Sequence, residues 1–599
     1  MAGNYWDNYW RERKSRRRFL GGAVAPGAGA SALALVGCGD DDDDDDDGGD
    51  GGGLATPTAG VNATPTPTDP LAGAKRGGTY KLDATGDPPT LDPYGNISFL
   101  TKAHAAAHYS RLYMYKAGPG IAYGSVRPTP DAAQSAESTP DGLKWTVKLR
   151  NNVKFHDIAP VNGRLMTTED IKLSWERANS ASSTNKPSAQ MPVDKVEFPD
   201  ANTMVFTMKA PAATFLDVLA DSNVFYILPK EAFSGGFDPA KISIGSGPWV
   251  WKTYEPSVKF IRDRHPAWHL GKPDGAPFFD TVETSIIPEY ANRLAQFLAG
   301  NSDTSDINAD DLPAMIKQLP TARIEARTGP TLSFTFFDPE ALTTGFAKDP
   351  RVRQAISMSY DRDALMELGY NVKKLRDAGL KVETKWHNVI PAGETAWWVD
   401  PTGTQMGDAA KYFKYNPTEA KALLSAAGFA SGVDAGTYQY TANRYGKLFN
   451  DIAEANIAFQ SAIGVKTTTE VQDYSSKYIT QTFIGNFKGI AFGYETPFPE
   501  AGSYLTRFFT DNPQNHSKVN DAELKKIAED AAKEVNEEKR KALFVQAQKI
   551  NAEKMYYIPN VAGAGTGWSA SQANIRNHPE FVTKAYGGYA ETVPFRWKA

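Results

Sequence analysis

Residues 1–76 have a composition that cannot bury a hydrophobic core. Asp40 to Asp47 are eight consecutive aspartates, followed by a glycine-rich run at 48–53 and by Thr-Pro repeats between 56 and 68. An acidic block repels itself, glycines stay flexible and Thr-Pro repeats favour extended backbone. We interpret residues 39–76 as a disordered tether with a reach of roughly 35 Å. The fold must therefore lie within residues 77–599.

A secretory signal precedes the tether. Ser15-Arg16-Arg17-Arg18-Phe19-Leu20 has the form of a twin-arginine signal, and an apolar run of small residues follows it from 21 to 37. That run is too short and too weakly apolar to span a bilayer comfortably. It ends in Leu35-Val36-Gly37-Cys38, and Cys38 is the single cysteine of the chain. This end resembles a bacterial lipobox, which implies that residues 1–38 are a signal peptide and that Cys38 is lipidated. The alternative is an N-terminal membrane anchor with an incidental cysteine.

Composition narrows the classes of function. The chain carries a net charge of −5, and residues 1–76 account for −4 of it, so 77–599 are nearly neutral. A neutral globular part without a basic patch argues against nucleic acid as a partner. Its 523 residues are too many for one core, so two or three domains are expected. The 12 Trp, 26 Tyr and 30 Phe supply apolar cores and also suit a ligand cleft lined by rings.

Strand and helix patterns alternate along the chain, which predicts an α/β fold. Strands are expected at 79–84, 249–251, 331–337, 436–441, 465–471 and 488–493, and helices at 99–115, 352–368, 418–427 and 522–553. Two hairpins are expected, one joining 145–150 to 153–155 and one joining 193–198 to 203–209. A helix over 171–178 should begin at an N-cap formed by Thr167 or Thr168, because Glu169 and Asp170 follow in its first turn.

The chain resembles the family 5 extracellular solute-binding proteins, which bind peptides, dipeptides or nickel for ABC importers. The resemblance covers about 76–570 and rests on segments in the same order as in the family. They are Arg76-Gly77-Gly78-Thr79-Tyr80, Leu91-Asp92-Pro93, 145–157, Thr168-Glu169-Asp170-Ile171, Gly245-Ser246-Gly247-Pro248-Trp249, 264–268, 298–300 with 306–307, 349–362, 420–428 and 463–466.

The resemblance implies a two-lobed periplasmic-binding-protein fold with an extra domain in the N-terminal lobe. We expect the first lobe at 77–327, the second at 328–556 and a return to the first lobe at 557–599. The implied function is a lipid-anchored substrate-binding protein that carries a peptide-like solute to the permease of an ABC importer. The expected protein is a monomer outside the cytoplasm, held at the membrane only through Cys38 and without a cofactor. An oligosaccharide is the alternative solute, and a secreted hydrolase is the alternative class.

In peptide binders of this family, an aspartate four residues before a proline takes the ammonium group of the ligand. Here Tyr494-Glu495 stand in Phe492-Gly493-Tyr494-Glu495-Thr496-Pro497-Phe498-Pro499, with Glu495 at that spacing from Pro499. The resemblance therefore assigns Glu495 to the ligand ammonium and Tyr494 to its surroundings. The alternative is an acid on a surface loop. The chain departs from the family here, because Glu replaces Asp and two extra residues follow.

Aromatic residues supply the other candidate contacts. Trp397 and Trp398 are adjacent rings in a loop rich in Gly and Pro, where stacking on a ligand is as natural as a core position. Tyr94 and Phe99, after the first strand, are further candidates. Dipeptide binders also pair the ligand carboxylate with an arginine, but the matching stretch 387–401 contains none. Arg444 is a candidate substitute.

Catalytic and metal-binding motifs are missing from the sequence. His104 and His108, and likewise His265 and His269, are four residues apart, yet neither pair has the Glu of a zinc-protease motif. Nucleophile elbows and phosphate loops are absent as well. We therefore expect packed or surface histidines, no bound metal and no enzymatic activity. Without clustered histidines, a nickel chelate is a less suitable ligand than a peptide.

Overall fold

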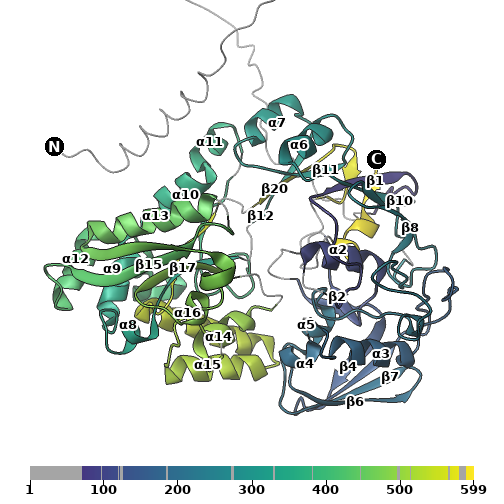
Figure 1. Ribbon diagram of the computed structural model, residues 1–599, viewed down its shortest axis with the longest axis horizontal. Helices are drawn as coiled ribbons and strands as arrows, with labels where there is room; N and C mark the ends of the chain where they lie inside the picture. Colours follow the sequence, from purple (N-terminus) through teal and green to yellow (C-terminus); the bar gives the residue numbers. More distant parts are fainter. Residues whose placement is uncertain are drawn as a thin grey trace, which may run out of the picture. The chain divides into compact units, whose positions relative to one another are not determined.

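The computed structural model describes residues 71–599, except 96–97, 119–120, 122–125, 184–185, 272–274, 328–330, 381, 446, 496–499, 513–514, 564–566 and 579–587. The predicted signal, Cys38 and most of the tether lie outside these residues. The described chain contains four sheets of three or more strands, with helices between them (Figure 1). We call the sheets built from residues 79–327 and 567–599 the N-terminal part, and the sheet and helices of residues 332–563 the C-terminal part.

The first sheet of the N-terminal part has the order β1-β10-β9-β8. Its strands are β1 (Thr79–Ala84), β10 (Thr281–Ile286), β9 (Lys259–Arg264) and β8 (Trp249–Glu255). The predicted strands at 79–84 and 249–251 are therefore confirmed. The helix expected to run to 115 is wrong beyond residue 108. Helix α2 (Phe99–His108) ends there, and β2 (Tyr113–Tyr115) pairs with β3 (Pro128–Pro130).

A second, antiparallel sheet of the N-terminal part has the order β4-β5-β7-β6. Strands β6 (Val193–Asp200) and β7 (Thr203–Met208) form the predicted hairpin. The other predicted hairpin is wrong, because β5 (Lys144–Leu149) pairs with β4 (Ala133–Ser138) and β7 instead. Helix α3 (Thr168–Ala178) begins earlier than the predicted 171, and its N-cap is Thr167, one of the two predicted candidates, which forms a capping box with Asp170. Short helices α4 (Pro187–Gln190) and α5 (Phe215–Ala220) complete this region.

The C-terminal part is built on a mixed five-stranded sheet, β16-β15-β17-β13-β18. All four strands that the sequence predicted here belong to it. They are β13 (Leu332–Phe337), β15 (Val433–Thr441), β16 (Val465–Gln472) and β17 (Ile490–Glu495), joined by β18 (Ile558–Pro559). Around them lie α8 (Pro339–Thr343), α9 (Pro350–Ser359), α10 (Arg362–Tyr370), α11 (Val372–Asp377), α12 (Pro417–Ala426), α13 (Lys447–Ala462) and α14 (Gly502–Phe509).

Two of the predicted helices are each divided into a pair. The helix expected at 352–368 is α9 followed by α10, because Asp361 accepts a hydrogen bond from the Ala364 amide and starts a new helix. The helix expected at 522–553 is α15 (Ala522–Lys533) followed by α16 (Glu537–Lys554). Here the Asn536 side chain accepts from the Lys539 amide and caps α16. The break between α15 and α16 places the start of α16 beside Arg127 of the N-terminal part.

The end of the chain returns to the N-terminal part. Strand β20 (Gly567–Ser571) lies between β11 (Thr304–Ile307) and β12 (Arg323–Arg327), next to α6 (Tyr290–Leu298) and α7 (Leu312–Gln318). Before it, β18 pairs with β13, and β19 (Val561–Gly563) pairs with β14 (Lys385–Trp386). Residues 558–563, which the sequence division placed in the return, thus pair with strands of the C-terminal part. Strands β21 (Ile575–Arg576) and β22 (Trp597–Lys598) end the fold.

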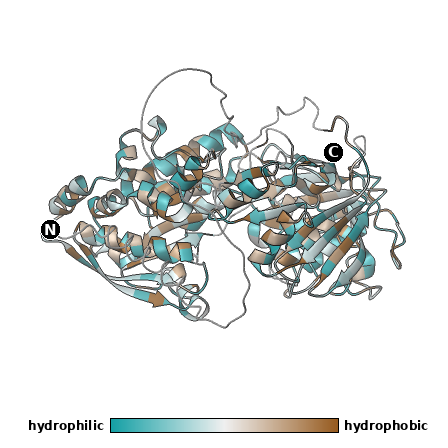
Figure 2. Cartoon of the chain, turned by 90° about the horizontal axis from the view of Figure 1, so that it is seen from above, coloured by the Kyte–Doolittle hydropathy of each residue, from teal (hydrophilic) through white to brown (hydrophobic). Residues whose placement is uncertain are grey.

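Hydrophobic and hydrophilic residues alternate along individual helices and strands (Figure 2). The apolar faces form separate cores, one under the β4–β7 sheet around Phe206 and Phe215, and one beside β13 around Phe334 and Phe508. Each part therefore contains an apolar cluster of its own, and the predicted division into domains stays a prediction. Within residues 71–599 as described, no helix combines the length and the apolarity needed to cross a membrane.

Candidate functional site

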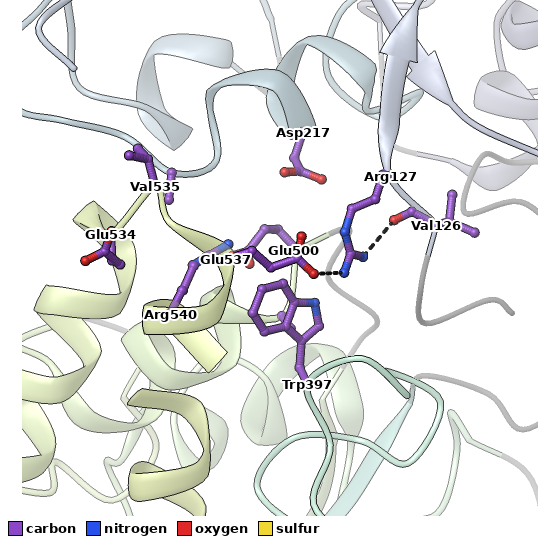
Figure 3. Close-up of a pocket in the computed structure, with 11 residues that line it drawn as sticks. Val126, Arg127, Asp217, Trp397, Glu500, Glu534, Val535, Glu537 and Arg540 are labelled. Carbon is purple, nitrogen blue, oxygen red and sulfur yellow. Dashed lines mark hydrogen bonds and ion pairs between the residues drawn. The ribbon is translucent and has the colours of Figure 1, made fainter. Parts of the chain in front are cut away.

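A cavity of about 140 Å³ lies where residues of the two parts meet (Figure 3). Val126, Arg127, Ala213 and Asp217 come from the N-terminal part, and Trp397, Glu500, Ala501, Glu534, Val535, Glu537 and Arg540 from the C-terminal part. Close to it, the Ala213 amide donates to the Ala532 carbonyl at 3.1 Å. A cavity of roughly 150 Å³ holds one benzene molecule, so this space suits one head group or side chain of a solute.

The side chains around the cavity form an acidic, aromatic environment. The lining residues include four acids, Asp217, Glu500, Glu534 and Glu537, and two arginines, so acidic side chains outnumber basic ones. The aromatic surface comes from Trp397, whose indole is mostly buried. Such a set favours a cationic group, because carboxylates attract it and an aromatic face binds it through the ring quadrupole.

Trp397 is fixed by its own loop and by α16. Its amide donates to the Glu394 carbonyl at 2.8 Å, and its carbonyl accepts from the Gln548 side chain at 2.8 Å. The indole packs against Phe544, with ring centroids 4.8 Å apart. Because α16 holds both the backbone and the ring, the aromatic wall of the cavity is preformed.

Two guanidinium groups lie over this indole. The Cζ of Arg540 is 5.2 Å from the ring centroid and the Cζ of Arg127 is 5.4 Å from it, and the two side chains are drawn on different sides of Trp397 in Figure 3. Arg540 is buried and donates to Glu500 at 2.5 Å and to the Ala531 carbonyl at 2.8 Å. This guanidinium is therefore held from both sides by the C-terminal part.

Arg127 reaches across from the N-terminal part to the first turn of α16. It donates to the Glu537 carboxylate at 2.8 Å and to the Val126 carbonyl at 3.3 Å. The hydrogen bond from Arg127 lowers the pKa of the Glu537 carboxyl. Glu537 stays ionised near pH 7 as a result, since the charged form is the one that Arg127 stabilises.

Glu495, at the end of β17, has a different environment. It is 2 % exposed, with its Oε2 2.8 Å from His516 Nε2 and its Oε1 4.0 Å from Arg507. The other imidazole nitrogen of His516 faces the Phe483 carbonyl, which can only accept a hydrogen bond. The Nδ1–H of His516 therefore donates to that carbonyl, and its Nε2 is hydrogen-bonded to the Glu495 carboxyl group. The carboxylate charge of Glu495 is compensated inside the C-terminal part.

The other predicted contact residues lie in several places. Tyr494 packs against Tyr445 and Phe449 at centroid distances of 5.3 and 4.7 Å, and burial raises the pKa of its hydroxyl. Trp398 donates from its indole nitrogen to the Trp386 carbonyl at 3.2 Å. Tyr94 is buried in the N-terminal part, where its hydroxyl donates to the Tyr226 carbonyl.

Phe99 is the first residue of α2, and its side chain lies outside the described residues. Among the predicted contact residues with described side chains, Trp397 is the one that lines the cavity. Sequence reasoning missed Arg127, Glu500, Glu537 and Arg540. Arg540 is the one charged residue of α16 that is buried, a position that the sequence alone does not show.

Contrary to the expectation of no clustered histidines, four imidazoles form a buried cluster in the N-terminal part, those of His104, His108, His156 and His265. His269 lies apart from them, with its Nε2 2.9 Å from Asp131. Arg262 donates to His104 Nδ1 at 3.2 Å and to His108 Nε2 at 3.3 Å, so both acceptor nitrogens carry no proton. His156 Nε2 and His265 Nδ1 each lie 3.1 Å from the Gly247 carbonyl. No set of three or more His, Cys, Asp or Glu side chains in the described part of the chain is arranged to hold a metal ion.

Burial strongly lowers the pKa values of these histidines. For His104 and His108 the pKa lies well below 6.5, with the Arg262 charge as a further cause. For His156 the pKa falls to about 3 and for His265 to about 4. All four imidazoles are therefore neutral in the folded protein near pH 7, and they serve as packed, hydrogen-bonded core residues.

Comparison with known proteins identifies the family. The family model described as bacterial extracellular solute-binding proteins, family 5 (middle region), matches residues 127–516, which is more than half of the chain. The chain belongs to this family. Its members bind solutes and are not enzymes, which confirms the expectation that this chain is no hydrolase. The signal and lipobox interpretations remain predictions.

Individual relatives agree with this assignment. The chain is 26 % identical over 495 residues to the probable D,D-dipeptide-binding periplasmic protein DdpA of Escherichia coli, covering 79 % of this chain and 86 % of that protein. It is 25 % identical over 482 residues to heme-binding protein A of Haemophilus influenzae, covering 76 % and 82 %. The solved structure of the murein tripeptide-binding protein MppA in its unliganded open form superposes with a TM-score of 0.70 at 19 % identity, covering 88 % and 97 %. The predicted periplasmic-binding-protein fold is thus confirmed.

Proposed function

We propose that this protein is the solute receptor of an ABC importer and that it binds a peptide-like solute through a cationic group. The observation that carries the proposal is the cavity beside Trp397, where four carboxylates and one aromatic face surround a space the size of a head group. An α-ammonium group or a basic side chain fits this chemistry. The name of DdpA, a D,D-dipeptide-binding relative, supports the same class of solute.

Haem is the other solute that a relative's name suggests. Its two propionate groups are anionic, and the excess of carboxylates at the cavity would repel them. An oligosaccharide would use the ring of Trp397 but would gain nothing from the carboxylates. The acidic lining of the cavity therefore favours a peptide over haem and over an oligosaccharide.

We further propose that the protein has two lobes, one at 77–327 together with the returning end of the chain and one at 328–556. The two lobes close on the solute. The proposal also includes export through the twin-arginine signal, lipidation at Cys38 and a flexible tether that lets the receptor reach its permease. Support for the anchor comes from the lipobox-like end of the apolar run and from the absence of any other cysteine in the chain.

Titration calorimetry on the chain from residue 39 to 599 tests the solute class. The probes are trialanine, its N-acetylated form and haem. We expect binding of trialanine and at least tenfold weaker binding of the acetylated peptide, because acetylation removes the ammonium charge. Equal affinity for both peptides would contradict a cation-binding site, and binding of haem alone would replace the peptide by a different solute.

A further inference from the structure

Arg127 and Arg540 contact the same indole, but the structure holds them very differently. The ion pair of Arg540 with Glu500 is buried, and the Arg540 Nε is also hydrogen-bonded to the Ala531 carbonyl. The side chains of Arg127 and Glu537 are 36 % and 49 % exposed. An exposed ion pair contributes little to stability because water screens it, whereas breaking a buried ion pair leaves an uncompensated charge inside the protein. Arg127 is therefore the guanidinium that can leave at low cost.

The departure of Arg127 would leave a complete cation site. Its guanidinium now contacts the face of Trp397, the Glu537 carboxylate and the Val126 carbonyl oxygen. These are the groups that recognise an ammonium or guanidinium ion: an aromatic face, a negative charge and a neutral acceptor. All three remain in place when the side chain swings away, because Trp397 is held by α16 and Glu537 begins that helix.

We propose that Arg127 is a specificity-determining residue that occupies the cation position of the cavity until a cationic group of the solute displaces it. The proposal rests on the proposed function, since it assumes a solute with such a group. Arg127 then acts as an internal competitor. If it fills the position in about nine molecules out of ten, the apparent dissociation constant of a cationic solute rises about tenfold.

A second role for the same contact would have the opposite effect. Arg127 and Glu537 are 410 residues apart in the chain and join the two parts of the protein. As a latch, the pair would favour the arrangement in which the two parts touch, and its loss would weaken the binding of every solute. The sign of the change in affinity on removing Arg127 therefore separates competition from latching.

The test compares Arg127→Gln with Arg351→Gln in the chain from residue 39 to 599. Arg351 is a matched control, because it forms an exposed ion pair with Asp349 and does not line the cavity. The probes in titration calorimetry are trialanine, N-acetyl-trialanine and agmatine, a small cation with no peptide bond. We expect Arg127→Gln to bind trialanine and agmatine about tenfold more tightly than the wild type, with the acetylated peptide unaffected. Arg351→Gln should match the wild type for all three.

The outcomes distinguish this proposal from the proposed function. Tighter binding of agmatine without binding of either peptide would support the role of Arg127 and reject the peptide solute. Weaker binding of both peptides by Arg127→Gln would support a latch and overturn the competition. Unchanged affinities, including undetectable binding of every probe by both proteins, would also overturn it. A melting temperature within about 2 °C of the wild type would show that the fold is intact, as expected for an exposed ion pair.

Discussion

Acid should destabilise the protein through the histidine cluster of the N-terminal part. His104 and His108 accept hydrogen bonds from Arg262, so a proton on either acceptor nitrogen would place two cations in contact. His156 and His265 share the Gly247 carbonyl, and a charge on either would be buried. The groups around Arg262 are Thr284 and the ring of Tyr589, which bring no negative charge to balance an added proton.

The sign and size of the effect follow from the lowered pKa values. In the unfolded chain a histidine titrates near 6.5, so below that pH the unfolded state binds protons that these four folded imidazoles do not. Their contribution to stability is complete above pH 6.5 and is lost progressively as the pH falls, down to about 4 for His265 and to about 3 for His156. From pH 7.5 to 5.0 the loss is about 2 kcal/mol for each histidine, or about 8 kcal/mol for four.

Two buried acids oppose this loss. Burial raises the pKa of Asp83 and Asp221 to about 6, so in the folded protein they take up protons over the same interval. They offset about 3 kcal/mol together. Burial also lowers the pKa of His387, in the C-terminal part, to about 3, which adds about 2 kcal/mol to the loss. The resulting net loss of about 7 kcal/mol is large against the roughly 5–15 kcal/mol by which a typical domain is stable.

Urea unfolding at pH 7.5 and 5.0 measures the change, and His156→Gln is the internal control. The introduced amide can still donate to the Gly247 carbonyl but does not titrate, so the loss in this variant should be smaller by about 2 kcal/mol. A loss below about 1 kcal/mol in the wild type, or the same loss in the variant, would show that these imidazoles are not neutral core groups.

Four further predictions concern other parts of the chain. Glu495→Gln should lower the melting temperature and change trialanine affinity less than threefold, because its charge is compensated by His516; a hundredfold loss of affinity would instead confirm the role in ligand binding inferred from the sequence. Cys38→Ala should move the protein from membrane to soluble fractions, and retention after a salt wash would refute lipid anchoring. Replacing Arg16 and Arg17 by Lys should trap precursor inside the cell, which pulse labelling detects; normal surface levels would mean that another route suffices. Gly245→Ala should destabilise by about 1–3 kcal/mol in urea unfolding, because a Cβ there meets the His108 carbonyl, whereas Gly86→Ala, which meets only ordinary contacts, should not.

The sequence predicted elements well where local pattern and tertiary context agree. In the five-stranded sheet, β13 and β17 are rich in apolar and aromatic residues, and β13 is buried along its whole length. Helix α3 carries its own start signal in Thr167 and Asp170. Local pattern failed at residues 109–115, where the apolar sequence fits a helix but Tyr113–Tyr115 pairs with β3. Helical periodicity depends only on residues a few positions apart, so it does not indicate pairing with β3.

The candidate site was predicted only in part, for a related reason. Trp397 was singled out as a large ring in a loop rich in Gly and Pro, and in the structure it both lines the cavity and packs into the apolar core beside β13. Arg127 and Glu537 carry no local signal, since each is an ordinary charged residue until the fold brings them together across 410 positions. The compensation of Glu495 by His516 was equally hidden, because spacing from a proline indicates a position on a loop but not the partner that lies beside it.

The return of β20 to the N-terminal part has a consequence for how the protein is made. The strand lies between β11 and β12, and after it Glu591 forms a buried ion pair with Arg111, 480 residues earlier. At roughly 5–20 residues per second, a ribosome needs about 24–96 s to travel from one of these two residues to the other. Until the end of that interval approaches, β11 and β12 have no strand between them, and their unpaired edges must be kept from other chains. Synthesis of the N-terminal part thus begins first and ends last. Its folding is therefore completed only after translation.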